Sequence, residues 1–85
     1  MAEQTVTIRN DVGLHARPAA LFAKKAGEYE ADVRVDKDGE EANAKSLLAV
    51  LKLDVRSGDT FTLRADGDDA EDAVAALAAF VEELA

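Results

Sequence analysis

The chain contains a single histidine, His15, which stands where a glycine-containing segment gives way to a helical pattern beginning at Ala16. The first N–H groups of a helix have no partner within the helix, and the helix dipole adds positive charge there, so a helix start stabilises a phosphate. The same dipole disfavours protonation of the imidazole and keeps a nitrogen lone pair available near neutral pH. Arg17 adds a mobile positive charge, and Pro18 rigidifies the first turn, where its missing N–H is not needed. These residues favour transfer of a phosphoryl group to and from His15.

Each of these residues also has a simpler explanation. A lone histidine at a helix start can be a capping or surface residue, Arg17 a solvated charge and Pro18 an ordinary helix starter. Residue types and spacing alone leave both interpretations open.

The rest of the chain supplies no complete enzyme site. It has no glycine-rich phosphate loop, no carboxylate pair with recognisable metal-binding spacing, and no serine or cysteine beside a base. One histidine and no cysteine also exclude a histidine cluster or a thiolate metal site. We therefore expect a protein without metal or cofactor, not an enzyme by itself, whose partners supply the catalytic groups. The small side chains of Ala16, Ala19 and Ala20 leave room for such a partner to approach His15 in line.

The overall charge is acidic. Ten basic and eighteen acidic residues give a formal charge of −8 and a pI near 4.4, so the general field repels nucleic acid and anionic membranes. The N-terminal residues have neither a basic nor an apolar segment, and no apolar stretch is long enough to span a bilayer. We expect a cytoplasmic protein that neither binds nucleic acid nor inserts into membranes.

Hydrophobic periodicity predicts the element order β-α-β-β-α-β-α. Strands are expected at residues 5–9, 32–36 and 60–65, where apolar and polar residues alternate, and at residues 40–43, which follow the hairpin turn at residues 37–39. Helices are expected from Ala16 to a cap at Gly27, after an N-cap at Ser46, and from Ala70 onward. This order indicates one α+β domain in which helices cover one face of an antiparallel sheet, with the strand order left open.

Each of the three helices has a predicted inward face. The first is expected to place an apolar stripe on one side, made of Ala19, Phe22, Ala23 and Ala26. The short helix after Ser46 is expected to point Leu47, Val50 and Leu51 inward. The last helix carries an apolar stripe at helical spacing, made of Ala70, Val74, Leu77, Ala78, Val81 and Leu84.

The segment Gly-Leu-His-Ala-Arg-Pro-Ala-Ala at residues 13–20 resembles the active-site motif of HPr, the histidine-containing phosphocarrier protein of the phosphoenolpyruvate-dependent sugar phosphotransferase system. Ala-Lys-Ser-Leu-Leu at residues 44–48 resembles the second motif of that family, and Ala-Asp-Gly-Asp-Asp at residues 65–69 resembles the turn before its last helix. The resemblance extends over essentially all 85 residues. It implies a single HPr-like domain over residues 1–85, folded as an open-faced β-sandwich whose four-stranded antiparallel sheet carries three helices on one face.

The resemblance also implies a role for each residue of the first motif. His15 would be phosphorylated on Nδ1 by enzyme I, which is charged from phosphoenolpyruvate, and would pass the group to the IIA component of a sugar permease. The backbone amides of Ala16 and Arg17 and the Arg17 side chain would stabilise the phosphoryl group, and Pro18 would keep the site rigid. We expect the carrier to be a monomer.

Ser46 matches the serine that an ATP-dependent HPr kinase phosphorylates in some bacteria, and it is also a good helix cap. Both roles stay open, and with them a kinase as a further partner. We expect Leu47, Leu48, Ala49 and Leu51 to contribute to partner docking. Leu48 lies off the inward stripe, so it is either an exposed docking contact or part of the core.

One departure from the family pattern concerns the turn after the short helix. Asp54 stands where the family commonly has glycine. Aspartate tolerates the left-handed backbone conformation, so we expect the turn to be kept.

Two other functions fit the same motifs. One is a regulatory relay with the same chemistry, such as a nitrogen-related branch or a relay that feeds dihydroxyacetone kinase. The other is an interaction module that docks regulators without carrying phosphate. The intact sequence His15-Ala16-Arg17-Pro18 argues against the interaction module.

Overall fold

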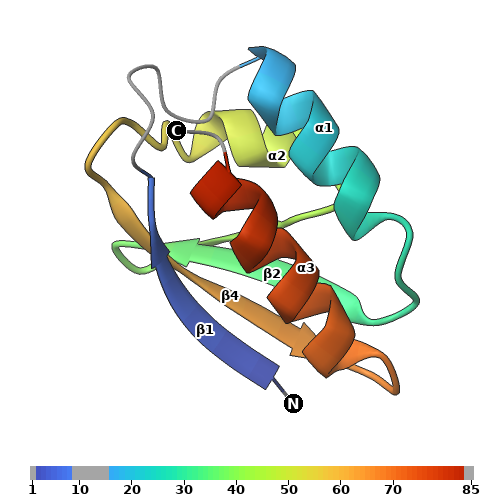
Figure 1. The fold of residues 1–85 in the computed structure, drawn as a ribbon. Coiled ribbons are helices and arrows are strands. Elements are labelled where there is room, and N and C mark those ends of the chain that lie inside the picture. Colours follow the sequence, from blue (N-terminus) through green and yellow to red (C-terminus); the bar gives the residue numbers. More distant parts are fainter. Residues whose placement is uncertain (1, 9–15, 84–85) are drawn as a thin grey trace.

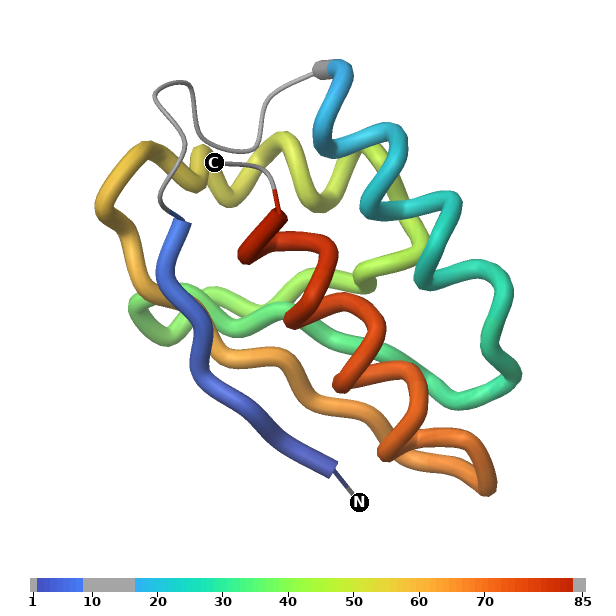
Figure 2. Tube along the Cα trace, viewed as in Figure 1, coloured from blue at the N-terminus to red at the C-terminus, as the bar shows by residue number. Residues whose placement is uncertain are grey.

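The computed structural model describes residues 2–8 and 16–83 of the chain. Within them the elements are β1 (Ala2–Thr7), α1 (Ala16–Ala26), β2 (Asp32–Lys37), β3 (Glu40–Asn43), α2 (Leu47–Lys52), β4 (Thr60–Asp66) and α3 (Ala70–Glu83). The four strands form one antiparallel sheet in the order β1-β4-β2-β3, and the three helices cover one of its faces (Figure 1). The predicted open-faced α+β sandwich is confirmed, and the strand order is now defined. Figure 2 shows that β1 and β4 lie side by side although most of the chain separates them.

The first strand begins earlier than its alternation predicted. Ala2–Thr7 pairs with β4 along its whole length, so backbone pairing extends the strand beyond the segment that carries the apolar alternation. Ile8 follows the strand and is held by two backbone hydrogen bonds: its N–H donates to the Asp59 carbonyl at 2.9 Å, and its carbonyl accepts from the Gly58 N–H at 2.8 Å. Arg9, the predicted last residue of the strand, lies outside the described residues.

Alternation along the strands separates the two faces of the sheet. The residues that face the helices are buried, and on the two central strands they are Val33, Val35, Phe61, Leu63 and Ala65. The residues between them face solvent and pair across strands, as in the hydroxyl contacts of Thr5 with Thr62 at 3.3 Å and of Thr7 with Thr60 at 3.0 Å. The open face is therefore polar, so it can face solvent without exposing a hydrophobic surface.

Three phenylalanines fix α1 against the sheet and α3. Phe22 of α1 is fully buried, and its ring meets Phe61 of β4 edge to face at a centroid distance of 6.5 Å. Its ring also meets Phe80 of α3 at 6.2 Å. Such pairs each stabilise a core by about 0.5–1.5 kcal/mol beyond the burial of their area. The contacts of Phe22, in the middle of α1, thus hold this helix against β4 and α3.

The inward face of α3 is confirmed, and that of α2 is confirmed in part. All the predicted stripe residues of α3 up to Val81 are buried, and Leu84 lies outside the described residues. On α2, Val50 is fully buried and Leu51 half-buried, but the prediction for Leu47 was wrong, because its side chain is 37% exposed. Leu47 is the first residue of the helix, and helical side chains tilt toward the N-terminus, so this one projects past the packed turn.

Asp69, just before α3, joins two distant loops. Its carboxylate accepts the backbone N–H groups of Glu30 and Ala31, each at 2.8 Å. The adjacent Gly67 has a φ of +145°, and a Cβ there would lie 2.9 Å from Cα of Ala31, so only glycine permits this close approach. Asp69 therefore holds the segment that connects α1 to β2 as well as lying directly before α3.

We expect Asp69→Asn to lower the melting temperature by several degrees at neutral pH. The amide would turn an N–H₂ group toward one of two backbone donors and leave that donor without an acceptor. The hydrogen bond from the Glu30 N–H is the main cause that holds the pKa of the Asp69 carboxyl below its ordinary value of 3.8. Because the folded-state pKa is depressed, the stabilisation is complete above the unfolded-state pKa and is lost as pH falls through the folded-state value.

Thermal unfolding measured from neutral to acid pH checks this prediction. The stability difference between the wild-type protein and Asp69→Asn should shrink in acid. The exposed neighbour provides the matched control, Asp68→Asn, which should melt like the wild-type protein. Equal melting temperatures for the two variants would contradict the structural role of Asp69.

Candidate functional site

The first turn of α1 presents the predicted phosphate-stabilising residues. The helix begins at Ala16, as predicted, so the residue before it, His15, precedes the helix directly, although His15 itself lies outside the described residues. Arg17 is exposed and Pro18 half-buried, while Ala19 of the next position is fully buried. This arrangement anchors the turn through Ala19 and leaves the Arg17 guanidinium in solvent, where it can move toward an anion at the helix start.

Ser46 is the N-cap of α2, as predicted. Its backbone is extended (φ −102°, ψ 112°), and its Oγ accepts the Ala49 N–H at 3.3 Å. Asn43 supports the cap from β3, because its backbone carbonyl accepts the Ser46 N–H at 3.0 Å and its side-chain oxygen accepts the Lys45 N–H at 3.0 Å. The hydroxyl is half-buried and its hydrogen bond is long, so the capping role is present and weak.

The four residues expected to dock a partner divide into two pairs. Leu47 and Leu48 are exposed, at 37% and 72%, whereas Ala49 and Leu51 are half-buried and pack against the core. The high exposure of Leu48 excludes a core role for this residue. Sequence reasoning missed Leu21 of α1, which is 50% exposed. The sequence did contain a signal for this exposure. Leu21 is a large apolar residue of the helix that lies off the inward stripe of Phe22, so helical spacing places it on the outer side.

Leu21, Leu47 and Leu48 are the large hydrophobic side chains that are exposed among residues 2–8 and 16–83. They lie on α1 and α2, which pack against each other and lie at the same end of the molecule (Figure 1). Exposed apolar patches are typical of protein-binding surfaces, so these two helices are the candidate docking surface. We call α1 and α2 with these three leucines the α1–α2 face.

The α1–α2 face also has a distinct charge. The two helices carry basic residues and no acidic one: Arg17, Lys24, Lys25 and Lys52. All eighteen acidic residues of the chain lie outside these helices. A chain with a net charge of −8 is therefore strongly polarised, with a basic and apolar face on a generally acidic molecule.

The turn after α2 keeps the shape expected for it. Asp54 has a φ of +52°, the left-handed conformation that glycine most readily adopts, so aspartate does replace glycine there. Its carboxylate accepts hydrogen bonds from Arg56, at 2.8 Å from Nη2 and 3.0 Å from Nε. The hydrogen bond from Arg56 is the main cause that lowers the pKa of the Asp54 carboxyl.

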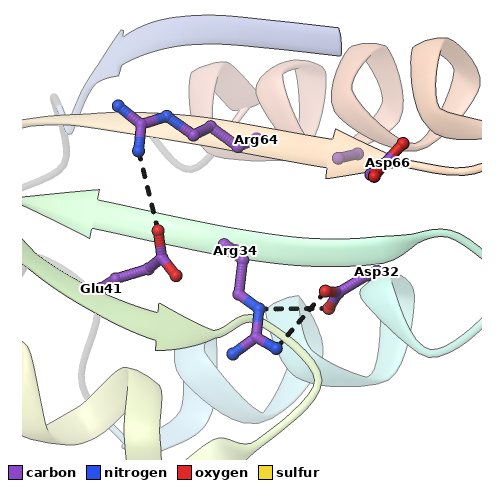
Figure 3. A pocket seen from close by; sticks show the side chains of 6 residues that line it. Asp32, Arg34, Glu41, Arg64 and Asp66 are labelled. Atoms are coloured by element: carbon purple, nitrogen blue, oxygen red, sulfur yellow. Dashed lines mark hydrogen bonds and ion pairs between the residues drawn. The ribbon is translucent and has the colours of Figure 1, made fainter. Parts of the chain in front are cut away.

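A shallow hollow on the open face of the sheet is not a second site. It is lined by Asp32, Arg34, Glu41, Arg64, Ala65 and Asp66 (Figure 3). Its arginines are already engaged, Arg34 with Asp32 at 3.1 Å and Arg64 with Glu41 at 3.6 Å and with two further carboxylates. The hollow lies on the face opposite the helices, so it shares no residue with the α1–α2 face.

Two other kinds of site are absent from the described part of the chain. No group of three or more histidine, aspartate or glutamate side chains in residues 2–8 and 16–83 could hold a metal ion. In the same residues, every helix is too short or too polar to cross a bilayer.

Comparison with known proteins gives the family. The family model for the PTS HPr component phosphorylation site matches residues 2–83. The chain is 45% identical over 83 residues to the HPr-like protein Crh of Bacillus subtilis, covering 98% of each protein. It is 40% identical over 84 residues to the phosphocarrier protein HPr of Vibrio cholerae, covering 99% of each.

The solved structures agree with the sequence relatives. A crystal structure of HPr from Thermoanaerobacter tengcongensis superimposes with a TM-score of 0.96 at 43% identity, covering 99% of this chain and 94% of that chain. A structure of an HPr dimer from the same organism gives a lower TM-score of 0.78, covering 98% and 95% of the two chains. On these matches the chain belongs to the HPr family of phosphocarrier proteins of the phosphotransferase system.

Proposed function

We propose that this chain accepts a phosphoryl group from phosphorylated enzyme I on Nδ1 of His15 and passes it to the IIA component of a sugar permease. The chain acts as a carrier and not as an enzyme, since catalysis is shared with the partner that docks on it. The position of His15 directly before α1, with Arg17 exposed on the first turn, supports this proposal. The backbone amides of Ala16 and Arg17 stabilise the phosphoryl group, and Pro18 keeps the turn rigid.

The observation that carries the proposal is the character of the α1–α2 face. A phosphocarrier has to bind a donor and an acceptor in turn through the surface around its phosphorylated residue. That surface therefore has to form complexes that associate quickly and also dissociate quickly. The basic side chains of the two helices suit partners with acidic surfaces and speed their encounter. Leu47 and Leu48 supply the apolar contacts, with Leu21 as a further docking residue and with Ala49 and Leu51 supporting them from below.

Incubation with phosphoenolpyruvate and enzyme I tests the proposal. We expect one acid-labile phosphate per chain, because phosphohistidine hydrolyses in acid whereas phosphoserine does not. Adding a IIA component should then remove the phosphate from the chain. A protein that takes no acid-labile phosphate under these conditions is not a carrier.

The exposed guanidinium gives a prediction of its own. We expect Arg17→Ala to slow phosphoryl transfer from enzyme I by about ten- to a hundredfold, because it removes a charge-assisted contact to the group in transit. Stability should stay within about 0.5 kcal/mol of the wild-type value, since the side chain is exposed. Arg34→Ala on the open face of the sheet removes the same charge and serves as the control, with transfer kinetics like those of the wild-type protein. Equal rates for the two variants would contradict a role for Arg17.

A second candidate function, regulation through Ser46, has its own supporting observation. Among the residues that the structure describes, the Ser46 hydroxyl makes one long capping hydrogen bond, and Ser46 stands directly before the exposed Leu47 and Leu48. A phosphate there would place negative charge beside the docking leucines and repel acidic partners. Incubation with ATP and an HPr kinase, followed by a search for acid-stable phosphate on Ser46, tests this role.

The carrier is further proposed to be a cytoplasmic monomer. Its compact fold matches the T. tengcongensis HPr structure with the TM-score of 0.96 far better than the dimer structure from that organism. Sedimentation equilibrium over a concentration series tests this proposal, and a mass of twice the 9.0 kDa of the chain would overturn it.

A further inference from the structure

The C-terminal end of α2 is held by a side chain from the sheet. Lys37, the last residue of β2, points its ammonium at the two residues that follow the helix: Nζ donates to the Leu53 carbonyl at 3.2 Å and to the Asp54 carbonyl at 2.9 Å. The same ammonium lies 3.1 Å from a carboxylate oxygen of Asp59. Only 17% of the Lys37 side chain is exposed. A residue of the sheet thus binds three residues of the segment that connects α2 to β4.

These contacts satisfy Lys37 completely. An ammonium group has three N–H donors, and here three oxygens receive them. The carbonyls at the end of a helix have no partner within the helix, and positive charge is favourable there. Saturated bonding of a mostly buried ammonium restricts its position, so Lys37 fixes the helix end to the sheet.

The loop after α2 is built around the same contacts. The Asp59 carboxylate that faces Lys37 also accepts the Arg56 N–H at 2.8 Å. Arg56 in turn binds the carboxylate of Asp54, whose backbone is left-handed. Residues 53–59 therefore form one connected turn, and Lys37 is the only one of these charged residues that comes from outside it.

Packing alone holds α2 weakly. The helix has only six residues, and Val50 is the one that is fully buried. Its N-terminal end is held by the Ser46 cap and its C-terminal end by Lys37. The helix carries two of the three exposed leucines of the α1–α2 face, so the fixation of its ends determines where Leu47 and Leu48 point.

We propose that Lys37 is a positioning residue for partner docking: by fixing the C-terminal end of α2 to the sheet, it orients Leu47 and Leu48 for the donor and acceptor proteins. Among the described residues, the Lys37 ammonium contacts Leu53, Asp54 and Asp59, and Lys37 lies outside α1 and α2. This inference rests on the proposed carrier function, so its test includes a measurement that needs no partner.

The measurement without a partner is amide hydrogen exchange in the full chain. Lys37→Met keeps most of the apolar stem and removes the ammonium. We expect the amides of Leu53 and Asp54, which donate to Val50 and Leu51 at the end of the helix, to exchange about tenfold faster, while β4 amides keep their rates. Arg34→Met, which removes one positive charge from the open face of the sheet, should leave all these rates unchanged. Unchanged rates at Leu53 and Asp54 in Lys37→Met would overturn the proposal.

The second measurement is the kinetics of phosphorylation by enzyme I. Lys37→Met should raise the KM for the carrier about tenfold and leave kcat unchanged, because docking is weakened while the chemistry at His15 is not. A fall in kcat at constant KM would overturn a positioning role in docking. Absence of phosphorylation in the wild-type protein would refute the proposed function, and the exchange data would still decide whether Lys37 fixes α2.

A milder variant keeps the test valid if Lys37→Met does not fold. Asp59→Asn weakens the ion pair but leaves the two carbonyl contacts of Lys37 in place. We expect its exchange and KM changes to have the same sign as those of Lys37→Met and to be smaller. Wild-type values for both measurements in a folded Asp59→Asn, together with an unfolded Lys37→Met, would make Lys37 a determinant of stability alone and overturn the proposal.

Discussion

Replacement of His15 by glutamine is expected to reduce phosphoryl transfer through the chain by more than about a thousandfold, to the background of the assay. Glutamine is uncharged and polar like the neutral imidazole, but its amide nitrogen has no available lone pair, so it cannot form the bond to phosphorus. His15 is the only histidine of the chain, which means that no other imidazole can substitute for it. The measurement is the transfer of radiolabelled phosphate from phosphoenolpyruvate through enzyme I to the chain and then to a IIA component.

The control for this variant separates loss of chemistry from loss of docking. His15→Gln with an intact α1–α2 face should still bind enzyme I and inhibit phosphorylation of the wild-type chain competitively. Acid stability of any residual label provides a second check, since phosphohistidine is labile and phosphoserine is stable. Acid-labile phosphate on His15→Gln would place the carrier residue elsewhere and contradict the assignment.

Local sequence signals predicted the elements that build the site. Period-two alternation placed β2 and β4 within one residue of their observed bounds, and the hairpin turn at residues 37–39 placed β3. Ser46 and the break at Gly27 marked helix ends correctly. These features depend on neighbours in the sequence, so the sequence contains them. The prediction that Asp54 can replace glycine also succeeded, because backbone tolerance of φ > 0 is a property of the residue itself.

Contacts between distant segments could not be predicted in this way. Lys37 and Asp69 each looked like an ordinary charged residue of a turn or helix start. The structure shows Lys37 bonded to residues 53, 54 and 59, and Asp69 to residues 30 and 31. Their roles depend on the strand order, which the hydrophobic pattern left open. The exposure of Leu47 was missed because it depends on the position of the first helical residue relative to the packed turn, which the apolar spacing does not give.

The charge distribution likewise depends on the fold as much as on composition. A net charge of −8 predicts repulsion of acidic partners when it is treated as uniform. The absence of acidic residues from α1 and α2 reverses that expectation for these two helices, which pack against each other. All eighteen acidic residues lie outside α1 and α2, so the negative charge of the molecule is concentrated away from these helices.

Leu48→Asp is expected to slow phosphoryl transfer from enzyme I by about ten- to a hundredfold with little change in stability. Leu48 is 72% exposed, so its replacement leaves no cavity, and an aspartate in the first turn of α2 interacts favourably with the helix dipole. The substitution removes an apolar side chain and places a negative charge on the α1–α2 face, which would repel the acidic partner surfaces that the proposed function requires. The loss should be found mainly in KM, because docking is altered and the chemistry at His15 is not.

Two further variants divide this effect into its parts. Ala75→Asp introduces the same charge at an exposed position of α3, outside the α1–α2 face, and should keep the transfer rate within about twofold of the wild-type value, as expected for a charge distant from the interface. Leu48→Ala removes the apolar contact without adding charge and should lie between the wild-type protein and Leu48→Asp. Equal rates for Leu48→Asp and Ala75→Asp would show that the position of the charge is irrelevant, and the α1–α2 face would then not be the docking surface. Unfolding of Leu48→Asp would contradict the exposure of Leu48, because a solvated side chain tolerates a carboxylate.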